Sequence, residues 1–209
     1  MAEAHEIFEK YAAWYAEHYM EVAPFAKGLD FYLQQLSDPQ AQILDIACGP
    51  GNIAAYLHKQ HPKLHITGID RAPTMIEIAK QQVPKARFEV LDAYEISNLK
   101  TYFDGVVLGF LLPYLLPDRL EDFFKNVKSN LKPGGLIYIS TIEGNPDTNG
   151  WQTNSKGDKV QMFYYREEDF KQLLRKMEAT LLHFEIIDFT KADGQKETNL
   201  VAVAQFPDI

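Results

Sequence analysis

Cysteine, basic charge and long apolar runs are all scarce in this sequence of 209 residues, and each shortage narrows the possible functions. Cys48 is the only cysteine, so no disulfide bond can form within the chain, and a cytoplasmic location is expected. The 21 Lys and Arg residues are outnumbered by 29 Asp and Glu residues, which gives a formal net charge of −8. A protein that follows a phosphate backbone needs a basic stripe. This balance therefore argues against nucleic acid as the main substrate, although it does not exclude a local basic patch.

No segment has the pattern of a signal peptide or a membrane span. The first six residues, MAEAHE, are acidic where a signal peptide begins with basic residues. The longest apolar run, residues 105–116, is broken by Pro113 and is shorter than the ~20 residues that cross a bilayer. Hydrophobic residues make up 46 % and charged residues 24 % of the chain, as in ordinary globular domains. We therefore expect one globular domain inside the cell, without membrane contact.

Helical and strand patterns alternate along most of the chain. A first helical segment spans residues 4–36 and is divided at Pro24. Strands are predicted at 42–47, 64–69, 86–91, 103–110 and 135–142, with helices at 52–60, 74–82 and 118–131 between them. Strands separated by helices pair in parallel, with helices on both faces of the sheet. The fold class is therefore α/β, with a Rossmann-like and mostly parallel sheet.

The last third of the chain departs from this alternation. A helix at 167–178 is followed by strands at 182–190 and 199–206, joined by a turn at 191–196, which predicts an antiparallel hairpin at one sheet edge. Residues 143–161 hold three glycines and three asparagines and show no clear element, so we expect a mobile loop. The predicted division is a helical cap at 1–40, a cofactor-binding core at 41–142, a lid loop at 143–162, and a helix with the hairpin at 163–209.

A glycine turn follows the first predicted strand, where ligands of such sheets commonly bind. Gly49 and Gly51 let the backbone approach a ligand closely, and the following helix supplies free N–H groups. Asp70 ends the second strand 19 residues after Gly51, a placement suited to ribose hydroxyls. Apart from binding a ligand, we expect a carboxylate at the end of a strand to contribute little to the stability of the fold. Taken alone, this fragment fits a dinucleotide-binding site equally well.

Two further carboxylates favour a ligand without phosphate. Asp45 lies four residues before Gly49, where it would repel a pyrophosphate and attract an ammonium group. Asp92 ends the third strand, near where an adenine would lie. Three acids at the ends of three successive strands suit a ligand with an amine, a ribose and an adenine. An NAD-dependent oxidoreductase is kept as the alternative.

Five motifs in order carry a resemblance to a known family. They are ILDIACGPG at 43–51, GID at 68–70 with Met75, LDA at 91–93, FDGVV at 103–107 and LKPGG at 131–135. This series resembles the class I S-adenosylmethionine-dependent methyltransferases, most of all the type 11 group that acts on small molecules. The resemblance covers residues 43–142, and the terminal hairpin also fits. It implies a seven-stranded sheet whose last strand is antiparallel, preceded by a helical cap.

The resemblance also implies which residues bind the cofactor, S-adenosylmethionine. Asp45 and the turn at 47–51 would hold its methionine part. Asp70 would bind the ribose and Asp92 the adenine. The full predicted cofactor-binding set is Asp45, Ala47, Cys48, Gly49, Gly51, Asp70, Arg71, Met75, Asp92, Ala93 and Phe110. Ala47 stands where glycine is commoner in the family and Ala72 where many members have serine; we expect the first change to narrow the turn only slightly.

The region after the fourth strand bears on the acceptor. Methyltransferases that modify nucleobase amines often carry Asn/Asp-Pro-Pro-Tyr/Phe there, whereas this chain reads LGFLLPY at 108–114. No carboxamide or carboxylate is available there to accept from an amino group, which favours a small organic acceptor. Transfer of a methyl group needs alignment and exclusion of water above all. A non-catalytic partner subunit that binds S-adenosylmethionine stays a second alternative.

Aromatic residues supply the candidates for catalysis and closure. Four aromatic residues of the first helix, at positions 11, 14, 15 and 19, would cap the cofactor, and those at 164 and 165 would line the acceptor pocket. The catalytic candidates are Tyr11, His18, Tyr19 and Tyr165, although packing explains the tyrosines more simply and an exposed helix position explains His18 more simply. Trp151 is the predicted docking group of the lid loop. His58 and His61 lack a third ligand, so no metal site is expected.

Overall fold

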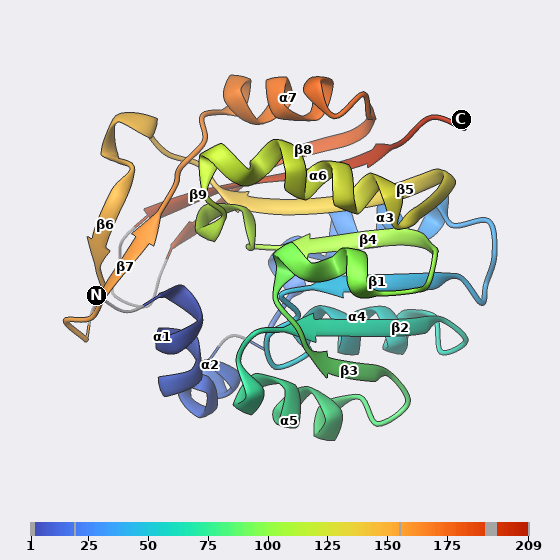
Figure 1. The fold of residues 1–209 in the computed structure, drawn as a ribbon, viewed down its shortest axis with the longest axis horizontal. Coiled ribbons are helices and arrows are strands. Elements are labelled where there is room, and N and C mark those ends of the chain that lie inside the picture. The colour runs from blue at the N-terminus through green and yellow to red at the C-terminus, as the bar shows by residue number, and fades with distance from the viewer. Residues whose placement is uncertain (1–2, 19, 155, 191–195, 209) are drawn as a thin grey trace.

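A seven-stranded sheet forms the centre of the structure, with helices on both of its faces (Figure 1). The computed structural model describes residues 3–18, 20–154, 156–190 and 196–208. The strands of this sheet are β1 (Gln42–Ile46), β2 (His65–Asp70), β3 (Arg87–Val90), β4 (Phe103–Gly109), β5 (Leu131–Ile142), β8 (Thr180–Thr190) and β9 (Lys196–Gln205). Their order across the sheet is β3-β2-β1-β4-β5-β9-β8.

The helices are arranged around this sheet in chain order. They are α1 (Ala4–Lys10), α2 (Ala12–His18), α3 (Ala26–Gln35), α4 (Asn52–Gln60), α5 (Pro73–Gln82), α6 (Leu120–Ser129) and α7 (Glu167–Lys176). Short 3-10 helices are η1 (Ala23–Phe25), η2 (Ala93–Asn98), η3 (Leu112–Tyr114), η4 (Pro117–Arg119) and η5 (Pro146–Thr148). Each predicted helix and strand from residue 42 to residue 142 is present, with bounds that differ by a few residues.

The parallel part of the sheet follows from buried strands joined by crossover helices. β1 pairs in parallel with β2 on one side and β4 on the other, so the strand order reverses beside β1. In each strand, alternate residues face opposite sides of the sheet. Ile43 and Val107 pack in the core beneath α3, α4 and α5, whereas Leu44 and Val106 pack beneath α6 and α7. The carboxyl ends of β1 to β4 therefore meet at one edge, beside the crevice where the order reverses.

The predicted antiparallel hairpin is confirmed at the sheet edge. β9 runs antiparallel to β5 and to β8, and β8 is the edge strand. The seven-stranded sheet with an antiparallel last strand is therefore as predicted. Residues 191–195, which hold most of the predicted turn, lie outside the described residues.

The N-terminal segment differs from the prediction of one helix divided only at Pro24. The chain also turns at Tyr11, which separates α1 from α2, and α2 ends at His18. Pro24 lies in η1, directly before α3, as expected. α1 and α2 pack against α5, whereas α3 packs against β5, β8 and β9 and so covers part of one face of the sheet. Only α1 and α2 lie at the edge where the strands end (Figure 1).

The segment from residue 143 to residue 162 is structured, and the expectation of no regular element there is wrong. η5 is followed by the antiparallel strands β6 (Gly150–Thr153) and β7 (Lys159–Met162). Asparagine side chains order the turns, because Asn145 accepts from the N–H of Asp147 and Asn149 from the N–H of Tyr164. Asn154 accepts from the N–H of Asp158 at 2.9 Å. The β6–β7 hairpin projects from the sheet beside α1 (Figure 1).

Candidate functional site

A cavity of about 800 Å³ lies at the carboxyl ends of the parallel strands. Its walls come from the strand ends, from α1 and α2, from the segment after β4, and from the β6–β7 hairpin. Eight of the eleven predicted cofactor-binding residues line it. These are Ala47, Gly49, Asp70, Arg71, Met75, Asp92, Ala93 and Phe110. Its volume lies in the upper part of the range of about 300–1,000 Å³ for small-molecule sites, which leaves room for two small ligands side by side.

Asp70 is fixed by one backbone group from the glycine turn after β1 and one from the turn after β2. One carboxylate oxygen accepts from the N–H of Gly49 at 2.9 Å, and the other accepts from the N–H of Ala72 at 2.8 Å. Burial raises the pKa of Asp70, and the hydrogen bonds from Ala72 and Gly49 oppose that rise. The expectation that this carboxylate supports little else is therefore wrong, because it ties the β1–α4 turn to the β2–α5 turn. A carboxylate has about four acceptor sites, so lone pairs are left for a ligand.

Asp45 lies beneath the turn rather than on the cavity wall. Its side chain is 1 % exposed, and Oδ2 has no hydrogen-bond partner among the residues that the structure describes. Burial and the charge of Asp70 raise the pKa of Asp45 to about 8, although a hydrogen bond with the backbone of Ala54 lowers it. The side chain is therefore largely protonated at neutral pH. The predicted contact between Asp45 and an ammonium group is not tested by this arrangement and stays a prediction.

Two cavity-lining residues hold a backbone conformation that side chains disfavour. Ala47 has φ +57° and Phe110 has φ +56°, both in the left-handed region. For residues with a Cβ this region costs roughly 1–2 kcal/mol. Such strain collects where a site requires a particular backbone path. Ala47 therefore strains the backbone of the glycine turn, whereas the sequence predicted only a slight narrowing of that turn.

Among the remaining members of the turn, Gly49 faces the cavity whereas Cys48 and Gly51 pack inward. A Cβ on Gly49 would meet nothing within 4 Å, which leaves its face open to the cavity, whereas a Cβ on Gly51 would come within 3.1 Å of Ala79. Gly51 is therefore needed for close packing of α4 against α5. Cys48 is buried, and burial raises the pKa of its thiol well above the ordinary value. A buried neutral thiol is a poor nucleophile.

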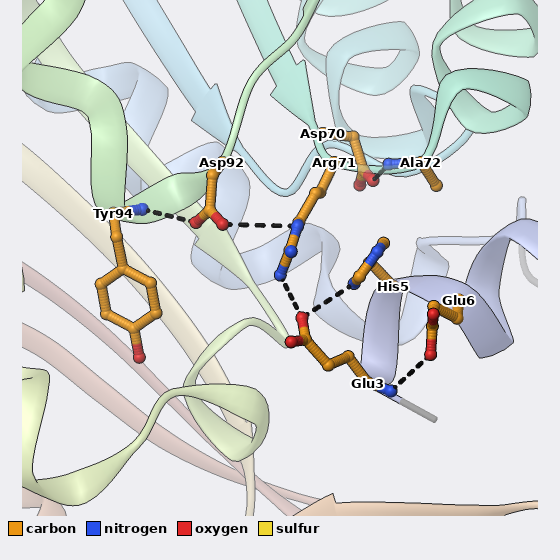
Figure 2. A network of polar contacts seen from close by, with 8 residues as sticks. All are labelled: Glu3, His5, Glu6, Asp70, Arg71, Ala72, Asp92 and Tyr94. Carbon is orange, nitrogen blue, oxygen red and sulfur yellow. Dashed lines mark hydrogen bonds and ion pairs between the residues drawn. The ribbon is translucent and has the colours of Figure 1, made fainter. Parts of the chain in front are cut away.

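Asp92 belongs to an ion-pair network that the sequence did not reveal (Figure 2). Its Oδ1 accepts from the N–H of Tyr94 at 2.9 Å, and its Oδ2 lies 3.4 Å from Nε of Arg71. Arg71 also contacts the carboxylate of Glu3, which in turn lies 3.3 Å from Nδ1 of His5. The start of α1 is thereby held over the end of the cavity that Asp70 and Asp92 form. No local pattern indicates Glu3, because its partner is 68 residues away.

α1 also holds the tip of the β6–β7 hairpin. Asp158 accepts from the hydroxyl of Tyr11 at 2.5 Å and lies 3.0 Å from Nζ of Lys10. Both bonds lower the pKa of Asp158. At its root, the hairpin is joined to the segment after β4, because Phe163 donates its N–H to the carbonyl of Pro113 at 2.8 Å. The hairpin and α1 are therefore joined to each other, and together they form one wall of the cavity.

The three catalytic candidates that the structure describes do not line the cavity. Tyr11 is bound to Asp158, and His18 stacks on Trp14 at 4.5 Å between ring centroids. Tyr165 packs against the core, and its hydroxyl has no hydrogen-bond partner in the described part of the chain. Tyr19 lies outside the described residues. None of the three described candidates lines the cavity, so a catalytic role for any of them stays a prediction.

Aromatic residues from α1, α2, η3 and the β6–β7 hairpin with its exit line the cavity, in addition to Tyr94 and Phe110. They are Phe8, Tyr15, Tyr114, Trp151 and Phe163, which we call the aromatic wall. The sequence singled out Tyr15 and Trp151 but missed the other three. Phe8 follows the buried Ile7 in α1 and packs against the small apolar cluster of Ala12, Ala72 and Met75, so its pattern is that of a core residue. Among the described residues, no helix is long and apolar enough to span a membrane, and no three His, Cys, Asp or Glu could hold a metal ion.

Comparisons with known proteins agree with this geometry. A family model described as a methyltransferase domain matches residues 43–135. The ubiquinone/menaquinone biosynthesis C-methyltransferase of Desulfotalea psychrophila is 34 % identical over 108 residues, which are 50 % of this chain and 43 % of that protein. The trans-aconitate 2-methyltransferase of Escherichia fergusonii is 35 % identical over 97 residues, or 46 % of this chain and 37 % of that protein. The chain thus spans less than half the length of these two relatives.

Similarity to solved structures extends over nearly the whole chain. The 1,6-didemethyltoxoflavin-N1-methyltransferase of Burkholderia thailandensis, crystallised with its substrate and S-adenosylhomocysteine, superposes with a TM-score of 0.73. It is 20 % identical, and the match covers 98 % of this chain and 87 % of that one. At this identity the similarity establishes the fold. The resemblance to class I methyltransferases that the five motifs carry is confirmed.

Proposed function

We propose that this chain, which has the class I methyltransferase fold and matches a methyltransferase-domain model at residues 43–135, methylates a small molecule. The methyl donor is S-adenosylmethionine. When bound, this cofactor would supply a methyl group on a sulfonium. An acceptor's lone pair would displace S-adenosylhomocysteine from that methyl carbon, and any proton lost by the acceptor would pass to solvent.

One observation carries the proposal: the cavity presents carboxylate acceptors for an adenosine, and one of them already occupies a backbone N–H of the glycine turn. Asp70 and Asp92 both line the cavity, and each carboxylate is oriented by a backbone N–H. The N–H of Gly49, which a pyrophosphate would use, is already donated to Asp70. This arrangement supports ribose at Asp70 and adenine at Asp92, with Met75 against the adenine. It disfavours NAD, for which the comparisons give no support.

The roles of the remaining parts follow from their positions. We assign residues 41–142 to cofactor binding and residues 1–40 to a cap, of which α1 and α2 cover the cavity. Residues 143–162 act as a lid in the form of a hairpin, with Trp151 on its cavity side. The chain's residues act by alignment and by exclusion of water, which is what direct displacement of a methyl group requires. The single cysteine supports a cytoplasmic location.

Two measurements test the proposal. Titration calorimetry should show binding of S-adenosylhomocysteine and no comparable binding of NAD; preferential binding of NAD would contradict the methyltransferase function. Methyl transfer from radiolabelled S-adenosylmethionine to a panel of phenols, amines and carboxylic acids then separates an enzyme from a non-catalytic subunit. A chain that binds the cofactor but methylates no member of a broad panel would favour the subunit. The panel includes analogues of the quinone precursors and of trans-aconitate that the relatives' names indicate.

A further inference from the structure

The aromatic wall gives the cavity a second surface, which adjoins the one that the strand ends provide where Phe8 and Tyr15 pack against the cluster that holds Met75. Phe8 and Tyr15 come from α1 and α2, Tyr114 from η3, and Trp151 and Phe163 from the β6–β7 hairpin and its exit. The eight predicted cofactor-binding residues at the cavity come from β1, β2, β3, β4 and the segments that follow them. Two small-molecule surfaces of different chemistry therefore share one cavity.

The rings of the aromatic wall support one another. Phe8 meets Tyr114 edge to face, with centroids 5.2 Å apart and planes at 89°. Phe8 also meets Tyr15 edge to face at 5.7 Å and 86°. Phe163 is 8 % exposed, whereas Trp151 is 44 % exposed. The wall is therefore fixed at its centre and open at Trp151, so its shape exists before a ligand arrives.

The charges at the cavity are nearly all paired within the protein. Arg71 contacts both Glu3 and Asp92, and Asp70 is held by backbone N–H groups. Arg119 is the one lining cation without an acidic partner in the described ranges, and its guanidinium lies 3.5 Å from the ring centroid of Tyr94. A ligand with two or three carboxylates would bring more negative charge than this one guanidinium balances. Burial of unpaired carboxylates is costly, so such a ligand fits poorly.

Resting on the proposed function, we propose that the acceptor is an aromatic ring compound with at most one negative charge, bound against the aromatic wall. Flat rings gain from each well-packed aromatic pair in addition to the burial of apolar area. A flexible aliphatic acid gains none of this. The ring would lie between the wall and the methyl group of the cofactor, and Trp151 would cover its outer face. The wall thereby determines which acceptors are methylated.

The test uses the full chain saturated with S-adenosylhomocysteine and two probes, 2-naphthol and citrate. Titration calorimetry should show binding of 2-naphthol and none of citrate at the same concentrations. Trp151→Ala and Phe8→Leu should each weaken 2-naphthol by about threefold to tenfold, the loss of one or two ring contacts. Tyr102→Ala is the matched control, because Tyr102 is 66 % exposed and does not line the cavity. It should leave 2-naphthol affinity unchanged.

The outcomes separate this inference from the function on which it rests. Tighter binding of citrate than of 2-naphthol, or failure of 2-naphthol to bind the loaded protein, would overturn the aromatic acceptor while leaving cofactor binding intact. Equal 2-naphthol affinity in Trp151→Ala, Phe8→Leu and the unmodified chain would also overturn it. Failure to bind S-adenosylhomocysteine at all would overturn the proposed function instead. Thermal unfolding of each variant verifies that the compared proteins are folded.

Discussion

Replacement of Asp70 should cost both folding stability and cofactor affinity, and the two losses have separate causes. In the ligand-free protein, Asp70→Ala removes the acceptors of the Gly49 and Ala72 N–H groups. A hydrogen bond to a charged group contributes about 1.5–3 kcal/mol, so two would give roughly 3–6 kcal/mol. Burial, which raises the pKa of this carboxylate, offsets part of that gain. We therefore expect a loss of about 2–4 kcal/mol in the free energy of unfolding.

Thermal unfolding without ligand measures this first loss. In a chain of this size 1 kcal/mol corresponds to about 2–4 °C, so Asp70→Ala should melt roughly 5–15 °C lower. Asp70→Asn keeps one carbonyl oxygen as an acceptor and should lose about half as much. Asp38→Ala is the control, because Asp38 accepts from the N–H of Gln40 at 2.8 Å on the exposed surface. Its melting temperature should stay close to that of the unmodified chain.

Calorimetric titration with S-adenosylhomocysteine at a temperature where all variants are folded measures the second loss. If the ribose hydroxyls donate to Asp70, its replacement by alanine should weaken binding at least tenfold, since each charged bond contributes about 1.5–3 kcal/mol. An affinity within twofold of the unmodified chain would place the ligand elsewhere. A melting temperature within 1–2 °C, by contrast, would refute the role of Asp70 as a tie between the two turns.

Three further predictions concern other parts of the site. Because the pKa of Asp45 rises to about 8, the folded state favours the protonated acid, and stability should fall as pH rises from about 4 to 8. In Asp45→Asn this fall, at most about 5 kcal/mol, should be absent from denaturant titrations across that range; an identical pH profile would contradict the shift. Ala47→Gly should raise the free energy of unfolding by up to about 1 kcal/mol, because relief of strain exceeds the added chain entropy, and a lower value would count against strain at φ +57°. Hydrogen exchange across residues 4–18 and 143–162 should slow when S-adenosylhomocysteine binds and speed up in Asp158→Ala, whereas equal exchange with and without ligand would rule out a ligand-closed lid.

The parallel sheet could be predicted because its signals are local. A buried strand such as β1 or β4 is a short apolar run, and the glycine turn and the strand-end acids follow such runs directly. Parallel strands then bring their carboxyl ends together whatever the details of packing. The sequence therefore placed Asp70 and Asp92 at one cavity without any knowledge of their neighbours. It did not reveal that Asp70 already holds two backbone N–H groups, because those bonds depend on the approach of two turns.

The sequence did not predict the β6–β7 hairpin because asparagine and glycine are common both in irregular loops and in ordered tight turns. Asparagine and glycine are typical of loops without regular structure, yet their side chains and left-handed backbones also build tight turns. Asn145, Asn149 and Asn154 all accept backbone hydrogen bonds in this segment, and Gly157 has φ +85°. Composition counts these residues but does not distinguish an unpaired side chain from one that closes a turn.

The two halves of the cavity therefore differ in how far the sequence can specify them. The cofactor half is built from consecutive strand ends, so local patterns identify most of its residues. The acceptor half depends on pairs far apart in the chain, such as Tyr11 with Asp158, 147 residues away, and Glu3 with Arg71. These pairs bring α1 and the hairpin together and so assemble the aromatic wall from segments that show no common motif. With the proposed function, we expect a sequence of this kind to predict its methyl donor well and its acceptor poorly, because the donor would bind at the strand ends and the acceptor against the segments that fold over them.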